Sequence, residues 1–169
     1  MKRPAEELVD IVSEAGQTIG VVTRREMRHQ RLPHRCVYLL VFSSRGELLI
    51  HQRTPDKDVY PSYWDLTVGG VLAAGESFGL GVRREAREEI GVDVEPVLLF
   101  PFRFEDTLTS VHAEVFRAVH DGPFQFQPEE IVGGEFARGA ALAERIARHR
   151  CCPDGLQVWA EYERRFPAR

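Results

Sequence analysis

Residues 83–91 read RREAREEIG, and three of these nine positions are glutamates. Side chains three and four positions apart share one face of a helix, so Glu85, Glu88 and Glu89 are expected to project together. Like charges at this spacing cost a helix only about 0.2–0.5 kcal/mol per pair, so a solvated face flanked by arginines would tolerate them. Taken alone, the stretch is compatible with a solvated helix face or with a site for a divalent cation.

The residues around this stretch favour the cation. Five residues separate Gly70 from Glu76, seven more separate Glu76 from Arg84, and Gly91 ends the acidic stretch. This spacing resembles the box of the Nudix superfamily, G-x5-E-x7-R-E-U-x-E-E-x-G-U, in which U is an aliphatic residue. Every fixed position is met, and Ala86 fills one aliphatic position as a small apolar side chain.

The resemblance implies a fold and a reaction. The fold is α+β, an α/β/α sandwich with a mixed central sheet, and the similarity covers roughly residues 34–166. The box is expected to form a helix from about Ser77 to Ile90, which stops at a glycine able to adopt positive φ. Divalent cations held by this helix would bind a diphosphate, and water would attack phosphorus in a nucleoside diphosphate linked to another group.

The same resemblance assigns roles to the residues of the box. Clustered carboxylates supply the hard oxygen ligands that Mg²⁺ prefers, with Mn²⁺ as a substitute, and they leave room for water and phosphate. The implied metal ligands are Glu85, Glu88 and Glu89, of which Glu88 and Glu89 are also catalytic candidates. Glu76 and Arg84 are expected to form an ion pair that orients these ligands. Gly70 is expected to allow close approach of the backbone, and Gly91 to end the helix.

The remaining elements are expected on both sides of the box. Residues 1–33 are interpreted as an N-terminal hairpin and short helix of the same domain, and residues 34–169 as the Nudix domain. The hydrophobic pattern predicts strands over residues 8–12, 18–22, 36–42, 47–52, 66–68, 97–104 and 111–119, and helices over residues 24–31, 139–149 and from 153 onward. The continuous apolar run 36–42 is typical of a central strand, with 47–52 as its hairpin partner.

A second resemblance is to the isopentenyl-diphosphate isomerase branch of the superfamily. It rests on HRCVYLLVFSSRGELLIHQRT at residues 34–54 and YPSYWD at residues 60–65. It implies an additional metal site formed by His34, His112 and Glu114. The isomerase reaction needs a cysteine just after the tryptophan, and residues 64–70 contain none. We therefore expect hydrolysis, with an isomerase-like enzyme or a non-catalytic ligand-sensing Nudix domain as the alternatives.

Hydrolysis also needs a base and substrate contacts. The candidate bases are Glu114 on a strand expected to face the box helix, Glu130 (or Glu129) in a late loop, or one of the box glutamates. Candidate substrate contacts are Arg53 and Arg103 for phosphate, and Phe104 and Trp64 for stacking on a base.

Composition restricts the partners. With 22 Lys and Arg against 26 Asp and Glu, the net charge is −4, which gives no general electrostatic case for a nucleic acid polymer or a membrane surface. The three cysteines have no metal-finger spacing and are expected to be free thiols, and no signal peptide or spanning segment is apparent. We expect a cytoplasmic protein with a small-molecule substrate; the resemblance also allows a homodimer.

Overall fold

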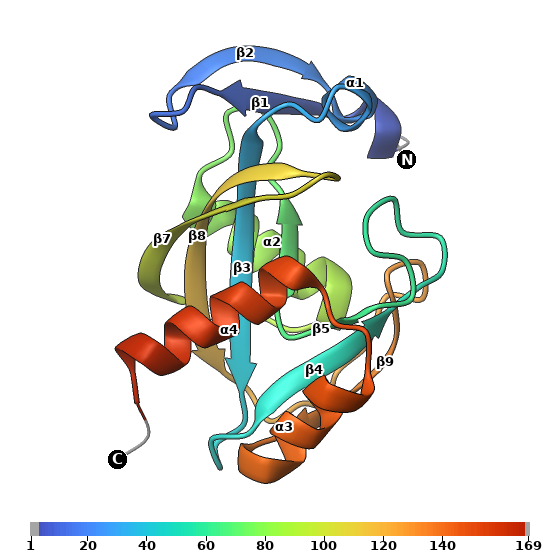
Figure 1. Cartoon of the computed structure of the whole chain (residues 1–169), viewed down its shortest axis with the longest axis vertical. Helices are drawn as coiled ribbons and strands as arrows, with labels where there is room; N and C mark the ends of the chain where they lie inside the picture. Colours follow the sequence, from blue (N-terminus) through green and yellow to red (C-terminus); the bar gives the residue numbers. More distant parts are fainter. Residues whose placement is uncertain (1–3, 168–169) are drawn as a thin grey trace.

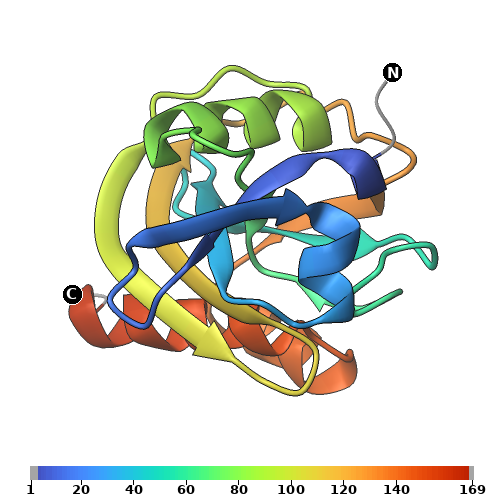
Figure 2. The same ribbon diagram turned by 90° about the horizontal axis from the view of Figure 1, so that it is seen from above.

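The computed structural model describes residues 4–167 as one mixed sheet with helices on both faces. The elements in chain order are η1 (Pro4–Glu6), β1 (Leu8–Val12), β2 (Thr18–Thr23), α1 (Arg24–His29), β3 (His34–Phe42), β4 (Leu48–Arg53), β5 (Trp64–Asp65), β6 (Val68–Val71), α2 (Phe78–Ile90), β7 (Val97–Glu105), β8 (Ser110–Val119), β9 (Ile131–Ala137), α3 (Gly139–Arg148) and α4 (Pro153–Arg165). Viewed from above, α2 and α4 lie on opposite sides of the sheet (Figure 2). The predicted α+β sandwich is confirmed. Within residues 4–167, no helix is long and apolar enough to cross a membrane.

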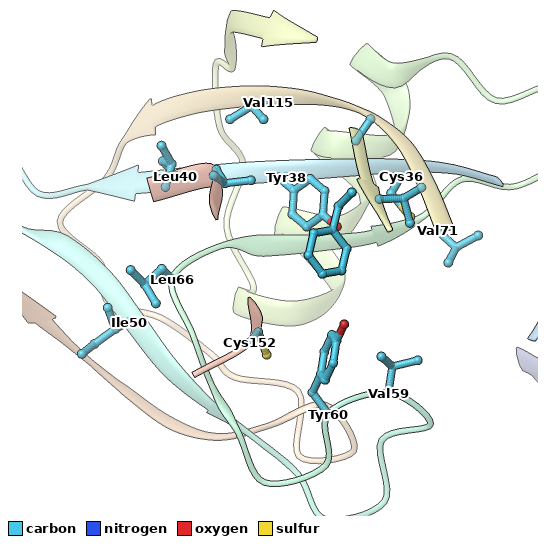
Figure 3. Packing of buried hydrophobic residues seen from close by; sticks show 14 of the residues in the cluster. Cys36, Tyr38, Leu40, Ile50, Val59, Tyr60, Leu66, Val71, Val115 and Cys152 are labelled. Carbon is cyan, nitrogen blue, oxygen red and sulfur yellow. The ribbon is translucent and has the colours of Figure 1, made fainter. Parts of the chain in front are cut away.

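Strand β3 is the centre of the sheet, as its apolar run predicts. It pairs with β8 in parallel and with β6 and β1 antiparallel. Because side chains alternate along a strand, Val37 and Leu39 pack toward α2, whereas Tyr38 and Leu40 belong to the core on the α4 side. Figure 3 shows part of this second core. Two hydrophobic cores therefore fix the positions of the helices on the two faces.

The sheet splits next to β3. Strand β4 was expected to be the hairpin partner of β3, but the two strands pair only at Phe42 and Leu48 beside the turn. Beyond that point β4 pairs with β5 and with β9, a strand that the pattern did not predict. Gly133 and Gly134 weaken the strand signal of β9, yet a Cβ on Gly134 would lie 2.9 Å from the Ile50 carbonyl oxygen. The divergence of β3 and β4 leaves space between the two halves of the sheet.

The pair Gly69-Gly70 lies inside a strand and not after one. The predicted strand 66–68 is replaced by β5 and β6, with Leu66 and Thr67 between them. Gly69 has φ of 154°, and a Cβ there would lie 2.0 Å from the Val37 carbonyl oxygen. Only glycine permits this close approach, so β6 can pair with β3 through its glycines.

The N-terminal hairpin lies across one end of the sheet (Figure 1). Strand β1 pairs with β2 along its length and with β3 through Ile11 and His34. Helix α1 ends at His29, earlier than predicted, and is joined to the loop after β4 (residues 54–63) by an ion pair of 3.1 Å between Arg28 and Asp58. This contact places α1 and that loop together over the split in the sheet.

Candidate active site

The box forms α2, and its apolar side chains decide where its glutamates point. The Ser77 hydroxyl accepts a hydrogen bond from the Leu80 amide at 3.3 Å, and the helix ends at Gly91 with φ of 70°. Val82, Ala86 and Ile90, spaced four residues apart, are fully buried against the sheet. The adjacent positions Glu85 and Glu89 are consequently turned toward β6, with only 8% and 5% of their surface exposed.

Arg84 joins the acidic residues of the box. Its Nε and Nη2 donate to both oxygens of Glu76 at 2.9 and 2.8 Å, and its Nη1 donates to Glu85 at 2.8 Å and Glu88 at 2.9 Å. Burial alone would raise the pKa of Glu76, but hydrogen bonds from Arg84 and the Ala73 amide lower it. The structure thus brings together the predicted Glu76–Arg84 pair and uses it to hold two more carboxylates in place.

The two buried glutamates are electrostatically costly without a cation. Burial, and then the charge of Glu89, raise the pKa of Glu85 to about 8, and burial also raises the pKa of Glu89. The absence of a side chain at Gly70 makes room for the carboxylate of Glu85, because a Cβ at position 70 would lie 2.8 Å from Glu85 Oε1. Glu89 Oε2 accepts the Gly69 amide at 3.3 Å. Such buried, close carboxylates fit a bound divalent cation, which would neutralise them.

The metal ligands are not fully assembled around one point. Within residues 4–167, no three His, Cys, Asp or Glu side chains are already arranged to hold a metal ion. The reason is visible in the ion pairs, since Arg84 contacts both Glu85 and Glu88. Mg²⁺ usually keeps several waters and few protein ligands, so a site completed by water and substrate phosphate remains compatible with these residues.

These side chains line a cleft of about 320 Å³. Arg24 from α1 and Lys57 from the loop after β4 line the same cleft. Glu7, Gln127 and Glu130 also line it; Arg24 lies 3.8 Å from Glu7, and Lys57 donates to Glu130. The cleft therefore combines a cluster of carboxylates with two basic side chains.

Of the predicted bases outside the helix, Glu130 alone borders this cleft in the described structure. Glu129 is exposed beside it, and its carbonyl oxygen accepts a hydrogen bond from Thr54. Glu114 lies elsewhere, in a hollow lined by Arg35, Phe78 and His112. Glu114 therefore does not line the cleft: its strand faces α2, as expected, but the side chain shares its hollow with Phe78 at the start of the helix.

The additional metal site is not assembled either. His34 pairs in register with Val111, and His112 pairs with Arg35, so the side chains of His34 and His112 lie on opposite faces of the sheet. Glu114 shares the face of His112. The resemblance named these residues but could not show the alternation of side chains across two paired strands.

The predicted substrate contacts are also dispersed. Arg53 lies in a cavity behind Gly69 and Gly70. Arg103 and Phe104 line a hollow near Glu14, and Phe104 is 4% exposed as part of the core. Trp64 stacks on His149 with ring centroids 4.7 Å apart. None of the last three borders the cleft in the described structure, so their assignment to substrate is not supported.

The two basic residues of the cleft, Arg24 and Lys57, were not predicted, and neither were Glu7 and Gln127. Neither basic residue lies in the box, and each reaches the cleft through tertiary contacts of the hairpin and the loop. Lys57 had a weak signal, as one of only two lysines in the chain. A lone lysine in a polar loop is ordinarily solvated, which is why it drew no prediction.

The fold and the site together define a class of protein: a mixed-sheet sandwich with a box helix that presents glutamates to a cation-lined cleft. The NUDIX domain family model matches residues 32–150. An uncharacterized Nudix hydrolase of Pseudomonas aeruginosa is 37% identical over 92% of this chain and 93% of its own, and the uncharacterized Nudix hydrolase YfcD of Shigella flexneri is 40% identical over 94% and 88%. The crystal structure of DR0079 from Deinococcus radiodurans matches with a TM-score of 0.78 and 32% identity, over 96% of this chain and all of that one. The chain belongs to the Nudix family, and its relatives mark it as a hydrolase.

Proposed function

We propose that the protein is a Mg²⁺-dependent pyrophosphohydrolase that cleaves the diphosphate bond of a nucleoside di- or triphosphate, or of another nucleoside diphosphate derivative. The observation that carries the proposal is the combination of charges that lines the cleft. Glu85, Glu88 and Glu89 line the same cleft as Arg24 and Lys57. Carboxylates and basic side chains around one space suit a metal-bound diphosphate.

The acidic and the basic side chains of the cleft have separate roles in the reaction. When bound, the metal ion lowers the pKa of water and neutralises charge on the diphosphate. Glu85, Glu88 and Glu89 would hold it, while Arg84 keeps their carboxylates in position. Lys57 and Arg24 bind phosphate oxygens and align the scissile bond.

Glu130 is the proposed base. In the free protein Lys57 donates to its carboxylate. When Lys57 turns to the phosphate, Glu130 is released to accept a proton from water. The resulting hydroxide forms a bond to phosphorus, the bridging P–O bond breaks, and its electron pair leaves with the departing phosphate. Glu89 is the alternative base, because its pKa is already raised by burial.

Isomerase chemistry is the second candidate, and one observation bears on it. Cys36 lines the cavity behind Gly69 and Gly70, but burial raises the pKa of its thiol to about 12, so it is held neutral. A thiol held neutral is a poor base for moving protons on carbon. We therefore propose hydrolysis, in a cytoplasmic protein that acts alone or as a homodimer.

The test is a substrate panel. The protein is incubated with nucleoside di- and triphosphates, sugar nucleotides, dinucleoside polyphosphates and isopentenyl diphosphate, with and without Mg²⁺. We expect Mg²⁺-dependent release of orthophosphate or nucleoside monophosphate from one set. A folded protein that releases neither from any compound would refute the hydrolase, and double-bond migration in isopentenyl diphosphate would establish the alternative.

The base is tested by a matched pair of variants. Glu130→Gln and Glu114→Gln remove one carboxylate each, and Glu114 lies outside the cleft. We expect the acidic limb of the kcat/KM profile to disappear in Glu130→Gln and to persist in Glu114→Gln. The reverse result would assign the base to Glu114 on β8.

A further inference from the structure

A second cavity lies directly behind the cleft. Gly69, Gly70, Arg24 and Lys57 line both spaces, so the two are neighbours across the glycine strand. The second cavity has a volume of about 70 Å³ and occupies the split between β3 and β4. In Figure 3, Cys36 and Tyr38 on β3 face Val59 and Tyr60 from the loop, and all four line this cavity. A group bound in this cavity would therefore lie next to a substrate bound over the glutamates.

His34 lines the cavity and carries an unused acceptor. The side chain is 1% exposed, and its Nδ1 lies 2.8 Å from the Leu32 carbonyl oxygen. Since a carbonyl oxygen only accepts, Nδ1 carries the proton. Burial lowers the pKa of His34 to about 3, so the ring is neutral and Nε2 keeps its lone pair. Nε2 has no hydrogen-bond partner.

Arg53 lines the same cavity and carries an unused donor. Its Nη atoms contact Asp65 at 3.5 Å and the Val59 carbonyl oxygen at 3.0 Å, but its buried Nε has no partner. The other polar groups are occupied: the hydroxyl groups of Tyr38 and Thr67 donate to carboxylates. Buried polar atoms are nearly always paired in native proteins, so an unmatched acceptor and an unmatched donor in one cavity indicate a ligand group that supplies both.

The size and charge of the cavity restrict that group. An apolar cavity that binds benzene has a volume of about 150 Å³, so a space of about 70 Å³ does not hold a nucleobase. The four cations that line the cavity are matched by four carboxylates. Asp58 is paired with Arg24 and Arg28, and Asp65 is paired with Arg53. Lys57 is paired with Glu130, and Asp154 is a further acid in the lining. A compact and neutral group is therefore favoured over a further phosphate.

We propose that this cavity is a specificity pocket for the hydroxyl groups of the substrate, with His34 Nε2 accepting from a hydroxyl and Arg53 Nε donating to one. Resting on the proposed function, this assigns the substrate class as ribonucleoside diphosphates and their derivatives, recognised through the ribose diol. The base remains outside the pocket, so the enzyme discriminates between sugars more strongly than between bases.

The test compares ribonucleoside diphosphates of four bases with their 2′,3′-dideoxy counterparts. His34→Asn keeps an amide at the position of Nδ1, where it can still donate to Leu32, but removes Nε2. His34→Gln restores a polar atom near the position of Nε2. We expect the wild-type protein to lose about tenfold or more in kcat/KM on the dideoxy compounds, with smaller differences between bases. In His34→Asn the preference for ribose should fall to nearly one, and His34→Gln should recover part of it.

An equal ribose preference in the wild type and in folded His34→Asn would overturn the proposal, as would base discrimination larger than sugar discrimination. If His34→Asn does not fold, Arg53→Lys, which lacks Nε, replaces it with the same expectation. A binding measurement separates this inference from the hydrolase proposal. Titration calorimetry with Mg²⁺ compares α,β-methylene ADP with its 2′,3′-dideoxy analogue, and neither is cleaved at that bond. Binding about tenfold weaker for the dideoxy analogue supports the pocket even without turnover; equal binding, or none, means that it holds water only.

Discussion

Gly70→Ala tests whether the box helix is positioned for chemistry. A Cβ at Gly70 would lie 2.8 Å from Glu85 Oε1 and 3.1 Å from both Cδ and Oε2. To reach an ordinary contact of 3.4 Å, the Glu85 carboxylate must retreat by about 0.6 Å. The backbone at this position is compatible with alanine, since Gly70 is not among the glycines with positive φ. The substitution therefore displaces one carboxylate and leaves the strand intact.

The size of the effect follows from that displacement. Mg²⁺ demands nearly ideal octahedral geometry at about 2.0–2.1 Å, and functional groups must be held within about 0.5 Å of their productive positions. A misplacement of about 1 Å can cost about 100-fold in rate, so a shift of about 0.6 Å should lower kcat by about 10- to 100-fold. Overpacking should cost about 1–3 kcal/mol of stability, which a domain with about 5–15 kcal/mol survives.

Two matched substitutions serve as controls. Gly69→Ala places a Cβ 2.0 Å from the Val37 carbonyl oxygen at a φ of 154°, so it should destabilise the fold by at least about 2 kcal/mol. Gly79→Ala meets no atom within 4 Å in the exposed first turn of α2, so it should stabilise the protein by about 0.5–1 kcal/mol with activity unchanged. Urea unfolding and Mg²⁺-dependent phosphate release measure both properties. Full activity in Gly70→Ala would refute the assignment of Glu85 to the metal site.

The remaining predictions concern the charges of the site and the buried histidines. Glu88→Gln and Glu89→Gln should each lower kcat by about 100-fold or more with the circular dichroism spectrum unchanged, and normal activity in both would contradict the metal assignment. Arg84→Met leaves buried carboxylates without their cation and should cost about 1–3 kcal/mol in thermal unfolding, whereas Mg²⁺ should restore part of the loss; a Tm equal to the wild type would show that the network is dispensable. The pKa values of His34 and His51 are lowered by burial to about 3 and about 4, so between pH 6.5 and 4 the unfolded chain binds more protons and stability falls as the pH falls. Each histidine contributes up to about 1.4 kcal/mol per pH unit to the change in the free energy of unfolding. In urea titrations at pH 7, 6 and 5, the free energy of unfolding of His34→Asn should therefore decline less steeply with falling pH than that of the wild type. An equal decline in both proteins would mean that the ring of His34 is charged in the native state.

The sequence predicted the box because all of its constraints are local. A helix period, an N-terminal serine and a stopping glycine decide α2, and Glu76 lies only eight residues from Arg84. The apolar run of β3 likewise reports its burial on both faces. These features depend on neighbours along the chain, so periodicity and spacing are sufficient to find them.

The errors arise where distant segments meet. Strand β9 contains a glycine pair that lowers its strand propensity. Its partner β4 lies more than seventy residues earlier in the sequence. The assignments of His112 and Glu114 failed because alternation on β8 turns both away from His34. Phe104 was predicted to stack on a base because it is aromatic, but its side chain is part of the core. Contact between separate strands decides all of these, and no local pattern encodes it.

The same reasoning explains why the N-terminal hairpin belongs to the site. The family match begins at residue 32, yet Arg24 from α1 lines both the cleft and the cavity behind it. Helix α1 is fixed from two sides: Thr23 caps it after β2, and its Arg28 is hydrogen-bonded to Asp58 at 3.1 Å in the loop that also carries Lys57. A shift of the hairpin would therefore move both cations of the cleft relative to the glutamates on α2. Since the box supplies the acidic side chains of the cleft, its two basic side chains depend on the hairpin and on the loop after β4.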